Sequence, residues 1–224
     1  RTNGLNQYES IKDKYYEYDI DIFKDIHNLK DKIHKIEDLK NYEKDIDNLE
    51  RRITIFHAEV IQDLEINDET LVGFHGQTIY HCPEEKISRQ LGNGKLLNQL
   101  VKKNVVFDFR ANDILHGGQG APLTPIFHNL ISHQSKIKLP VCFLNIGGIS
   151  NITVITGNND FSDLASKDIG PGNCLIDYWI RKNSNKKFDQ NGLIALSGTR
   201  NEIIFEQAQE LYMNRNNKKK LTYD

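Results

Sequence analysis

A short apolar run followed by a glycine-rich polar loop is the feature that most constrains how this chain can fold. The pairing first occurs near residue 71 and recurs to about residue 173. Apolar runs this short are typical of buried strands, and their alternation with loops and short helices is typical of α/β domains. Because ligands of open α/β sheets bind at the ends of the strands, these loops are the best candidates for a functional site.

Helices are predicted where apolar residues recur every three or four positions. This periodicity runs from Ile20 to Lys35 and again, more strongly, from Ile46 to Leu64. Shorter helices are predicted over Leu96–Lys103, Pro125–Ser132, Asn173–Lys182 and Asn201–Met213. The helix that starts at Asn173 is expected to bury Leu175, Ile176, Trp179 and Ile180.

Strands are predicted only after the second helix. The apolar runs that indicate them are Leu71–Phe74, Asn104–Arg110, Val141–Asn145, Ile152–Ile155 and Leu164–Ile169. Gly147 and Gly148 connect two of these runs, and a two-glycine connection is a hairpin signal because glycine adopts positive φ at little cost.

Charge and hydropathy exclude several classes of protein. The formal net charge of −2 argues against nucleic acid as a partner, because affinity for phosphate backbones comes from concentrated positive charge. No run of about 18 apolar residues occurs, so no membrane span is predicted. Cys82, Cys142 and Cys174 are widely spaced and odd in number, which indicates neither a disulfide framework nor a paired-cysteine zinc site. With no secretion leader recognisable, we expect a cytoplasmic protein.

The loop Asp168–Asn173 combines a carboxylate at a predicted strand end with the backbone N–H groups of a helix start. Because helix N-termini favour anions, the loop could face phosphate while Asp168 accepts a proton. The alternative is structural: Asn173 caps the helix and Asp168 is hydrogen-bonded within the turn. The residues alone leave both interpretations open.

Two further loops have the same ambiguity. Asn145–Asn151 would let a backbone approach a ligand closely, or it is an ordinary tight hairpin. His75–Thr78 supplies donors and acceptors suited to sugar hydroxyls or an amide. His75 and His81 suggest a metal, but no partner stands at ligand spacing, so no protein metal site is predicted.

A fourth candidate joins Asp108–Arg110 to the loop Gly117–Pro122. A strand followed by a glycine-dense loop can close over a substrate. It can equally be a connection with several special turn angles, and the sequence does not decide between the two.

Taken together, these segments resemble the anhydro-N-acetylmuramic acid kinase family. The matching stretches, in order, are Phe56–Glu59, Gly73–Thr78, Asp108–Arg110 with Gly117–Leu123, Asn145–Ile152 and Asp168–Asn173. Each stretch alone is weak, but all of them in register over about residues 45–200 are specific.

The resemblance implies an α/β fold of the two-lobed actin-like ATPase type, related to ribonuclease H, hexokinase and the heat-shock ATPases. It implies a first lobe over residues 1–140 and the start of a second over 141–224. The sequence has no Gly-Thr-Ser-x-Asp-Gly loop, with which the family opens, and stops before an adenosine-binding segment. We therefore expect a piece of the family fold that lacks both ends.

The resemblance also implies a reaction. The family opens the 1,6-anhydro bond of anhydro-N-acetylmuramic acid with water and transfers the ATP γ-phosphate to O6. The product is N-acetylmuramic acid 6-phosphate, an intermediate of cell-wall (peptidoglycan) recycling. ATP and Mg²⁺ are the implied cofactors, the anhydro amino sugar is the implied partner, and a homodimer is compatible with the sequence.

The family motifs assign roles to particular residues. Asp168 matches the catalytic aspartate, which would take a proton from the attacking water. Sugar contacts are placed at His75, Gln77, Thr78, Gln119, Gly120 and Asn145. Phosphate contacts are placed at Gly147, Gly148, Gly170, Gly172 and Asn173.

Two other functions remain open at the level of the sequence. The chain could be a different sugar kinase of the same superfamily. It could also be a non-catalytic sugar-binding or regulatory protein that kept the fold and lost the chemistry with ATP.

Overall fold

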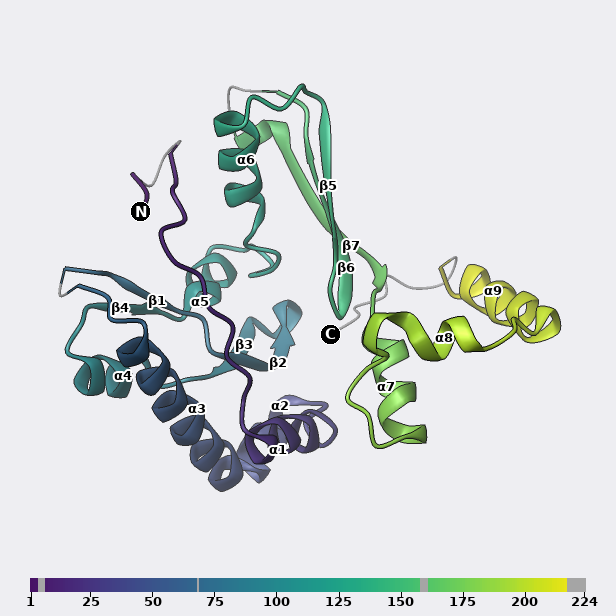
Figure 1. The fold of residues 1–224 in the computed structure, drawn as a ribbon, viewed down its shortest axis with the longest axis horizontal. Coiled ribbons are helices and arrows are strands. Elements are labelled where there is room, and N and C mark those ends of the chain that lie inside the picture. The colour runs from purple at the N-terminus through teal and green to yellow at the C-terminus, as the bar shows by residue number, and fades with distance from the viewer. Residues whose placement is uncertain (4–6, 68, 158–160, 217–224) are drawn as a thin grey trace. The chain divides into compact units, whose positions relative to one another are not determined.

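The computed structural model describes residues 1–3, 7–67, 69–157 and 161–216, which form two compact units (Figure 1). One unit holds Arg1 and Glu9–Leu123, and the other holds Thr2–Tyr8 and the chain from Thr124 onward. We describe each unit by itself. The division into lobes at residue 140 concerns the complete family fold and stays a prediction.

Helices build one side of the first unit. They are α1 (Ile20–Lys30), α2 (Ile36–Asn41) and α3 (Glu43–Asp63). The apolar stripes of α1 and α3 pack together and against two strands, and Leu39 of α2 packs against this core. The core is made of Ile22, Ile26, Leu29, Ile33, Ile46, Leu49, Ile53, Ile79 and Leu91. The predicted long helix over 46–64 is thus confirmed, with its start three residues earlier.

The prediction of one helix from Ile20 to Lys35 is wrong at its end. Helix α1 stops at Lys30, and a new helix begins at Ile36. The Asp38 carboxylate accepts the backbone N–H groups of His34 and Lys35, at 3.0 and 3.2 Å. Asp38 belongs to the first turn of α2, so these bonds cap the N-terminus of α2 with one of its own side chains and stabilise a separate helix start.

The strands of the first unit form two small sheets. Strand β1 (Val72–Phe74) pairs in parallel with β4 (Val105–Phe107), and β2 (Gln77–Cys82) pairs antiparallel with β3 (Ile87–Leu91). Between the last two lies a 3-10 turn, Pro83–Glu85. Helix α4 (Gly94–Val101) follows β3 and confirms the helix predicted over Leu96–Lys103, with its bounds shifted by two residues. The β2–β3 hairpin was not predicted.

The predicted strand Asn104–Arg110 is correct only at its centre. Asp108 has φ 58°, a left-handed conformation that ends β4, and α5 (Phe109–Leu115) starts at the next residue. Phe109 and Arg110 are therefore helical. Non-glycine residues adopt positive φ rarely, so the apolar pattern could not reveal this turn.

The second unit is built on an antiparallel meander. Strands β5 (Val141–Ile146), β6 (Ile149–Ile155) and β7 (Leu164–Pro171) form one sheet in the order β5-β6-β7. Helix α6 (Pro125–Gln134) packs along this sheet, where the His128 ring stacks on Phe143 with centroids 4.9 Å apart (Figure 1). The predicted strands and the glycine hairpin are confirmed.

Helices follow the sheet. They are α7 (Cys174–Asn183), α8 (Leu193–Ser197) and α9 (Glu202–Asn216), with a 3-10 turn at Gln190–Gly192. Another 3-10 turn, Phe161–Asp163, lies between β6 and β7. The predicted burial of α7 is wrong in large part. Ile180 is buried, but Leu175, Ile176 and Trp179 are 55–62% exposed. None of the described helices is long and apolar enough to cross a membrane.

The Thr54 hydroxyl ties helix α3 to the start of α4. It is fully buried, donates to the Glu50 carbonyl at 2.7 Å and accepts the Asn93 N–H at 3.0 Å. We expect Thr54→Val to lower the free energy of unfolding by about 1–3 kcal/mol, because the Asn93 N–H loses its acceptor. Urea unfolding measures this loss. The Asn93 amide should also exchange hydrogen faster in Thr54→Val than in Thr54→Ser, and equal exchange rates would contradict the assignment.

Burial lowers the pKa of His57 below its ordinary value of 6.5. The ring lies against Phe74 and 3.1 Å from the Tyr18 hydroxyl. As the pH falls below about 6.5, the unfolded chain takes up a proton that the folded chain refuses. We therefore expect the free energy of unfolding to fall from about pH 7 toward the lowered folded-state pKa. Urea unfolding over this range should show a shallower pH slope for His57→Gln, and identical slopes would contradict the prediction.

Candidate functional site

The hairpin turn of the second unit is held by the start of α7. The N–H groups of Gly172 and Cys174 donate to the Gly148 carbonyl at 2.9 and 3.1 Å, and the Asn173 N–H donates to the Gly147 carbonyl at 2.7 Å. The Asn173 side chain adds a bond to the Ile146 carbonyl at 3.3 Å. Two loops that lie far apart in the sequence therefore form one compact structure.

This docking corrects the prediction that the helix start offers free donors to a phosphate. The N–H groups of Gly172 and Asn173 are used by the hairpin carbonyls. Among the described residues, it is the N–H groups of Gly147 and Gly148 that have no hydrogen-bond acceptor. The turn's own donors thus suit an anion better than the helix start does.

Gly172 is required by this close approach. A Cβ atom at Gly172 would lie 2.2 Å from the Gly147 carbonyl oxygen. Gly170 has φ 155° and is buried, and a Cβ there would lie 2.9 Å from the Tyr212 hydroxyl. These two glycines therefore shape the loop through packing, whereas the predicted role for both was phosphate binding.

Asp168 lies within a strand, because β7 continues past it to Pro171. It pairs with Asn151 of β6, which in turn pairs with Asn145 of β5. The register shifts directly after this row, where Ser150 pairs with Gly170 and Ile169 is the extra residue of a β-bulge. The Asp168 and Asn145 side chains are exposed and Asn151 is half-buried. The sequence gave Asn151 only as part of the Asn145–Asn151 motif, and the register reveals that it lies beside Asp168.

The first unit brings together His75, Arg110 and Gly120. The Arg110 side chain donates from Nε to His75 Nε2 at 3.1 Å and from Nη1 to the Gly120 carbonyl at 2.9 Å. The Gly120 N–H donates to Asp113 Oδ2 at 2.6 Å. Gly120 is thus held at both of its backbone polar groups. The sequence did not single out Asp113, and it gave Arg110 only as part of a motif.

Arg110 also sets the tautomer of His75. A guanidinium can only donate, so His75 Nε2 must accept. The proton then lies on Nδ1, which is 2.9 Å from the Gly76 carbonyl. Both ring nitrogens of His75 are therefore bonded within the protein, and only the flat face of the ring could contact a ligand.

The other sugar contacts predicted in the first unit lie in a strand and in a loop. Gln77 and Thr78 are in β2, paired with Leu91 and Gln90. The Thr78 hydroxyl accepts from Gln90 Nε2 at 3.3 Å. Gln119 is exposed in the loop between α5 and α6.

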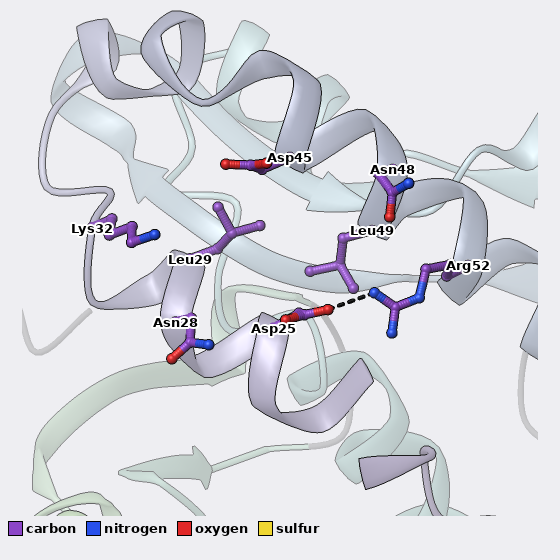
Figure 2. Close-up of a pocket in the computed structure, with 8 residues that line it drawn as sticks. All are labelled: Asp25, Asn28, Leu29, Lys32, Asp45, Asn48, Leu49 and Arg52. Atoms are coloured by element: carbon purple, nitrogen blue, oxygen red, sulfur yellow. Dashed lines mark hydrogen bonds and ion pairs between the residues drawn. The ribbon is translucent and has the colours of Figure 1, made fainter. Parts of the chain in front are cut away.

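A hollow of about 220 Å³ lies between α1 and α3 (Figure 2). Figure 2 shows the Asp25–Arg52 ion pair on its wall, with Asn48 and Lys32 around it. It contains none of the predicted site residues, and its walls are the solvated faces of two core helices. We therefore do not place the function there.

Comparison with known proteins decides the family. A sequence model described as "Anhydro-N-acetylmuramic acid kinase" matches residues 4–220. A Pelagibacter ubique protein with the same name is 51% identical over 227 residues, covering 100% of this chain. Relatives with this name from Agrobacterium fabrum and Methylobacterium nodulans are 42% and 41% identical, each over 69% of this chain. The chain belongs to the anhydro-N-acetylmuramic acid kinase family.

Membership in the anhydro-N-acetylmuramic acid kinase family confirms the predicted family and fold class, and the mixed helices and sheets agree with an actin-like ATPase. The chain spans 60% of the length of the Pelagibacter relative, and the matched parts cover 43% and 42% of the other two.

The side chains of this kinase-family chain offer oxygen donors for a cation near Asp168. Within the described ranges, no group of three or more His, Cys, Asp or Glu side chains could hold a metal ion. Mg²⁺ usually needs only one or two carboxylates, with phosphate and water oxygens completing its octahedron. Asp168 and the amide oxygens of its row fit that donor set, whereas they do not fit a permanently bound transition metal.

The docking of α7 on the hairpin predicts a stability difference between two glycines. Gly172→Ala should lower the free energy of unfolding by about 1–3 kcal/mol, because its Cβ meets a carbonyl oxygen. Gly148→Ala is the control, since the atom nearest its Cβ would be 4.0 Å away. Urea unfolding of both variants tests this. Equal effects would show that the helix start does not rest on the turn.

Proposed function

We propose that this chain is part of an ATP-dependent kinase that opens 1,6-anhydro-N-acetylmuramic acid and phosphorylates its O6. The observation that carries the proposal is the 51% identity, across the whole chain, to a protein named for that activity. The product would be N-acetylmuramic acid 6-phosphate, made during recycling of the cell wall.

The phosphate end of the site is proposed at the β5–β6 turn. The Gly147 and Gly148 N–H groups, without acceptors among the described residues, support binding of ATP phosphate oxygens there. Gly170, Gly172 and Asn173 would support the structure of the turn and would not bind the phosphate themselves. When bound, Mg²⁺ would neutralise phosphate charge, with Asp168 and Asn145, which lie in one cross-strand row, as the side chains to hold it.

Asp168 is proposed as the general base. Its exposed carboxylate would take a proton from a water molecule as the water oxygen forms a bond to the anomeric carbon. The bond from that carbon to O6 breaks, O6 bonds to the γ-phosphorus of ATP, and ADP leaves. A carboxylate suits this task because it is ionised at neutral pH.

Sugar contacts are proposed in each unit separately. In the first unit, His75 would present its ring face, and Gln77 and Thr78 would supply amide and hydroxyl groups. In the second unit, Asn145 would supply an amide. Gln119 would contact the sugar from its exposed loop. Gly120 would shape that loop, since both of its backbone polar groups are already bonded.

The setting of the reaction is part of the same proposal. An amino sugar released inside the cell and ATP are both cytoplasmic, so we place the protein in the cytoplasm. A homodimer is proposed as its assembly, which sedimentation at several protein concentrations would test.

The experiment uses a polypeptide that carries this sequence within the length of its relatives, given ATP, Mg²⁺ and the anhydro sugar. Asp168→Asn should lower kcat by about 10²-fold or more, because a proton acceptor is lost while the shape is kept. Glu206→Gln, an exposed carboxylate change on α9, is the control. Ring-opened 6-phosphorylated sugar is measured by mass spectrometry. A folded parent that forms none would overturn the kinase assignment and favour a sugar-binding protein.

A further inference from the structure

The glycine-rich loop after helix α5 begins as the C-terminal cap of that helix. The Gly118 N–H donates to the Asp113 carbonyl at 2.8 Å, and the Gly117 N–H donates to the Ile114 carbonyl at 3.1 Å. Gly117 has φ 88°, so the two bonds form a Schellman motif, in which a left-handed glycine reverses the chain after the last helical turn. The reversal carries the chain back over Asp113.

The Asp113 carboxylate binds the returning chain. Its Oδ2 accepts the N–H of the buried residue Gly120 at 2.6 Å, and hydrogen bonds to an ionised carboxylate are roughly twice as strong as those between neutral groups. A Cβ atom at Gly118 would lie 2.2 Å from the same oxygen, so the chain passes this close only as glycine. Asp113 therefore accepts two N–H groups of the loop, one through its carbonyl and one through its carboxylate.

Gln119 lies between these two bound glycines. The Gly120 N–H belongs to the planar peptide unit that follows Gln119, so the carboxylate fixes the backbone directly on that side. The Arg110 guanidinium holds Gly120 through its carbonyl at 2.9 Å. The Gln119 side chain is exposed, and its amide makes no hydrogen bond within the described ranges. Its backbone is thus fixed while its amide is available to a ligand.

We propose that Asp113 is a positioning residue for Gln119, holding its backbone so that the side-chain amide meets a polar group of the sugar. The inference rests on the proposed function, in which Gln119 contacts the anhydro sugar. A loop rich in glycine has much conformational freedom to lose when a ligand binds. A loop that is already fixed avoids that cost on binding, and the carboxylate of Asp113 supplies the bond that fixes it.

No second group of the described chain duplicates this bond. Asp113 is the only acceptor of the Gly120 N–H among the described residues. The nearby His116 ring is bonded through Nδ1 to the Asn112 carbonyl. Asn112 precedes Asp113 on the same helix, is exposed, and its side chain makes no hydrogen bond in the described part of the chain. Asn112→Ala is therefore a matched control for Asp113→Ala.

The first experiment follows the Gly120 and Gln119 amides by NMR in this chain. Asp113→Ala removes the acceptor, so the Gly120 N–H should exchange hydrogen about 10-fold faster or more, and the order parameter of the Gln119 amide should fall. Asp113→Asn keeps an acceptor oxygen and should stay close to the parent, as should Asn112→Ala. Parent-like exchange of the Gly120 amide in Asp113→Ala would overturn the proposal.

The second experiment is a double-mutant cycle in the polypeptide of the relatives' length. Gln119→Ala and Asp113→Ala should each lower kcat/KM for 1,6-anhydro-N-acetylmuramic acid by about 10-fold, mainly through KM, because a binding contact is lost. The KM for ATP should not change, since the proposed phosphate contacts belong to the β5–β6 turn. Asp113→Asn should recover most of the loss, and a variant as poor as Asp113→Ala would argue against the acceptor role.

The double variant gives the decisive result. If Asp113 acts through Gln119, the variant that carries both alanines should be no worse than about 10-fold below the parent. A role in the fold alone would act independently of Gln119, and the two effects would multiply to about 100-fold. A multiplicative loss would therefore overturn the positioning role.

The outcomes separate this inference from the proposed function. An active parent with a multiplicative loss overturns the positioning role alone. A parent that binds the anhydro sugar in calorimetry without phosphorylating it removes the kinase assignment, and the same cycle of variants measured on Kd then tests Asp113. A parent that neither binds nor reacts overturns both. Urea unfolding of each variant excludes loss of the fold as the cause.

Discussion

The second unit depends on the docking of helix α7 onto the glycine hairpin. Three backbone N–H groups at the start of the helix donate to the two carbonyls of the Gly147–Gly148 turn. A helix start always has N–H groups without partners inside the helix, and here the hairpin satisfies those of Asn173 and Cys174 and also the N–H of Gly172 just before them. The carbonyls of the turn are thereby used for structure, whereas its N–H groups have no hydrogen-bond acceptor among the described residues. This docking explains why residue 172 is a glycine, because a Cβ atom there would collide with the Gly147 carbonyl oxygen.

In the first unit, side chains rather than a hairpin satisfy the backbone groups of a loop. The loop after α5 has no strand partner, so Asp113 and Arg110 bind the N–H and the carbonyl of Gly120. Because Arg110 also donates to His75, the loop and the histidine are positioned by the same guanidinium. A change at Arg110 would therefore affect two regions that are 45 residues apart in the sequence, the stretches around His75 and Gly120.

The sequence predicted the elements whose signals are local and failed where a distant contact decides. The apolar stripe from Ile46 onward and the runs of β5, β6 and β7 were sufficient, since their periodicity is strong. Helix α1 ended early because Asp38 caps a new helix, and β4 ended early because Asp108 adopts positive φ. The β2–β3 hairpin was missed because polar residues such as Gln77, His81 and Arg89 interrupt the alternation expected of strands. The exposed face of α7 could not be foreseen, because periodicity shows which face is apolar and not whether another element covers it.

By itself, the sequence determined the long helix α3, the glycine hairpin and the family, because these depend on local spacing and on ordered motifs. It also pointed to Asp168 as a candidate for chemistry. Only the tertiary structure decided which groups surround that residue. The strand register placed Asn151 and Asn145 beside it, and the docking of α7 decided which backbone donors remain available. The physical reason is that register and docking arise from pairing between segments far apart in the chain, where a shift of one residue would turn every side chain of a strand to the other face.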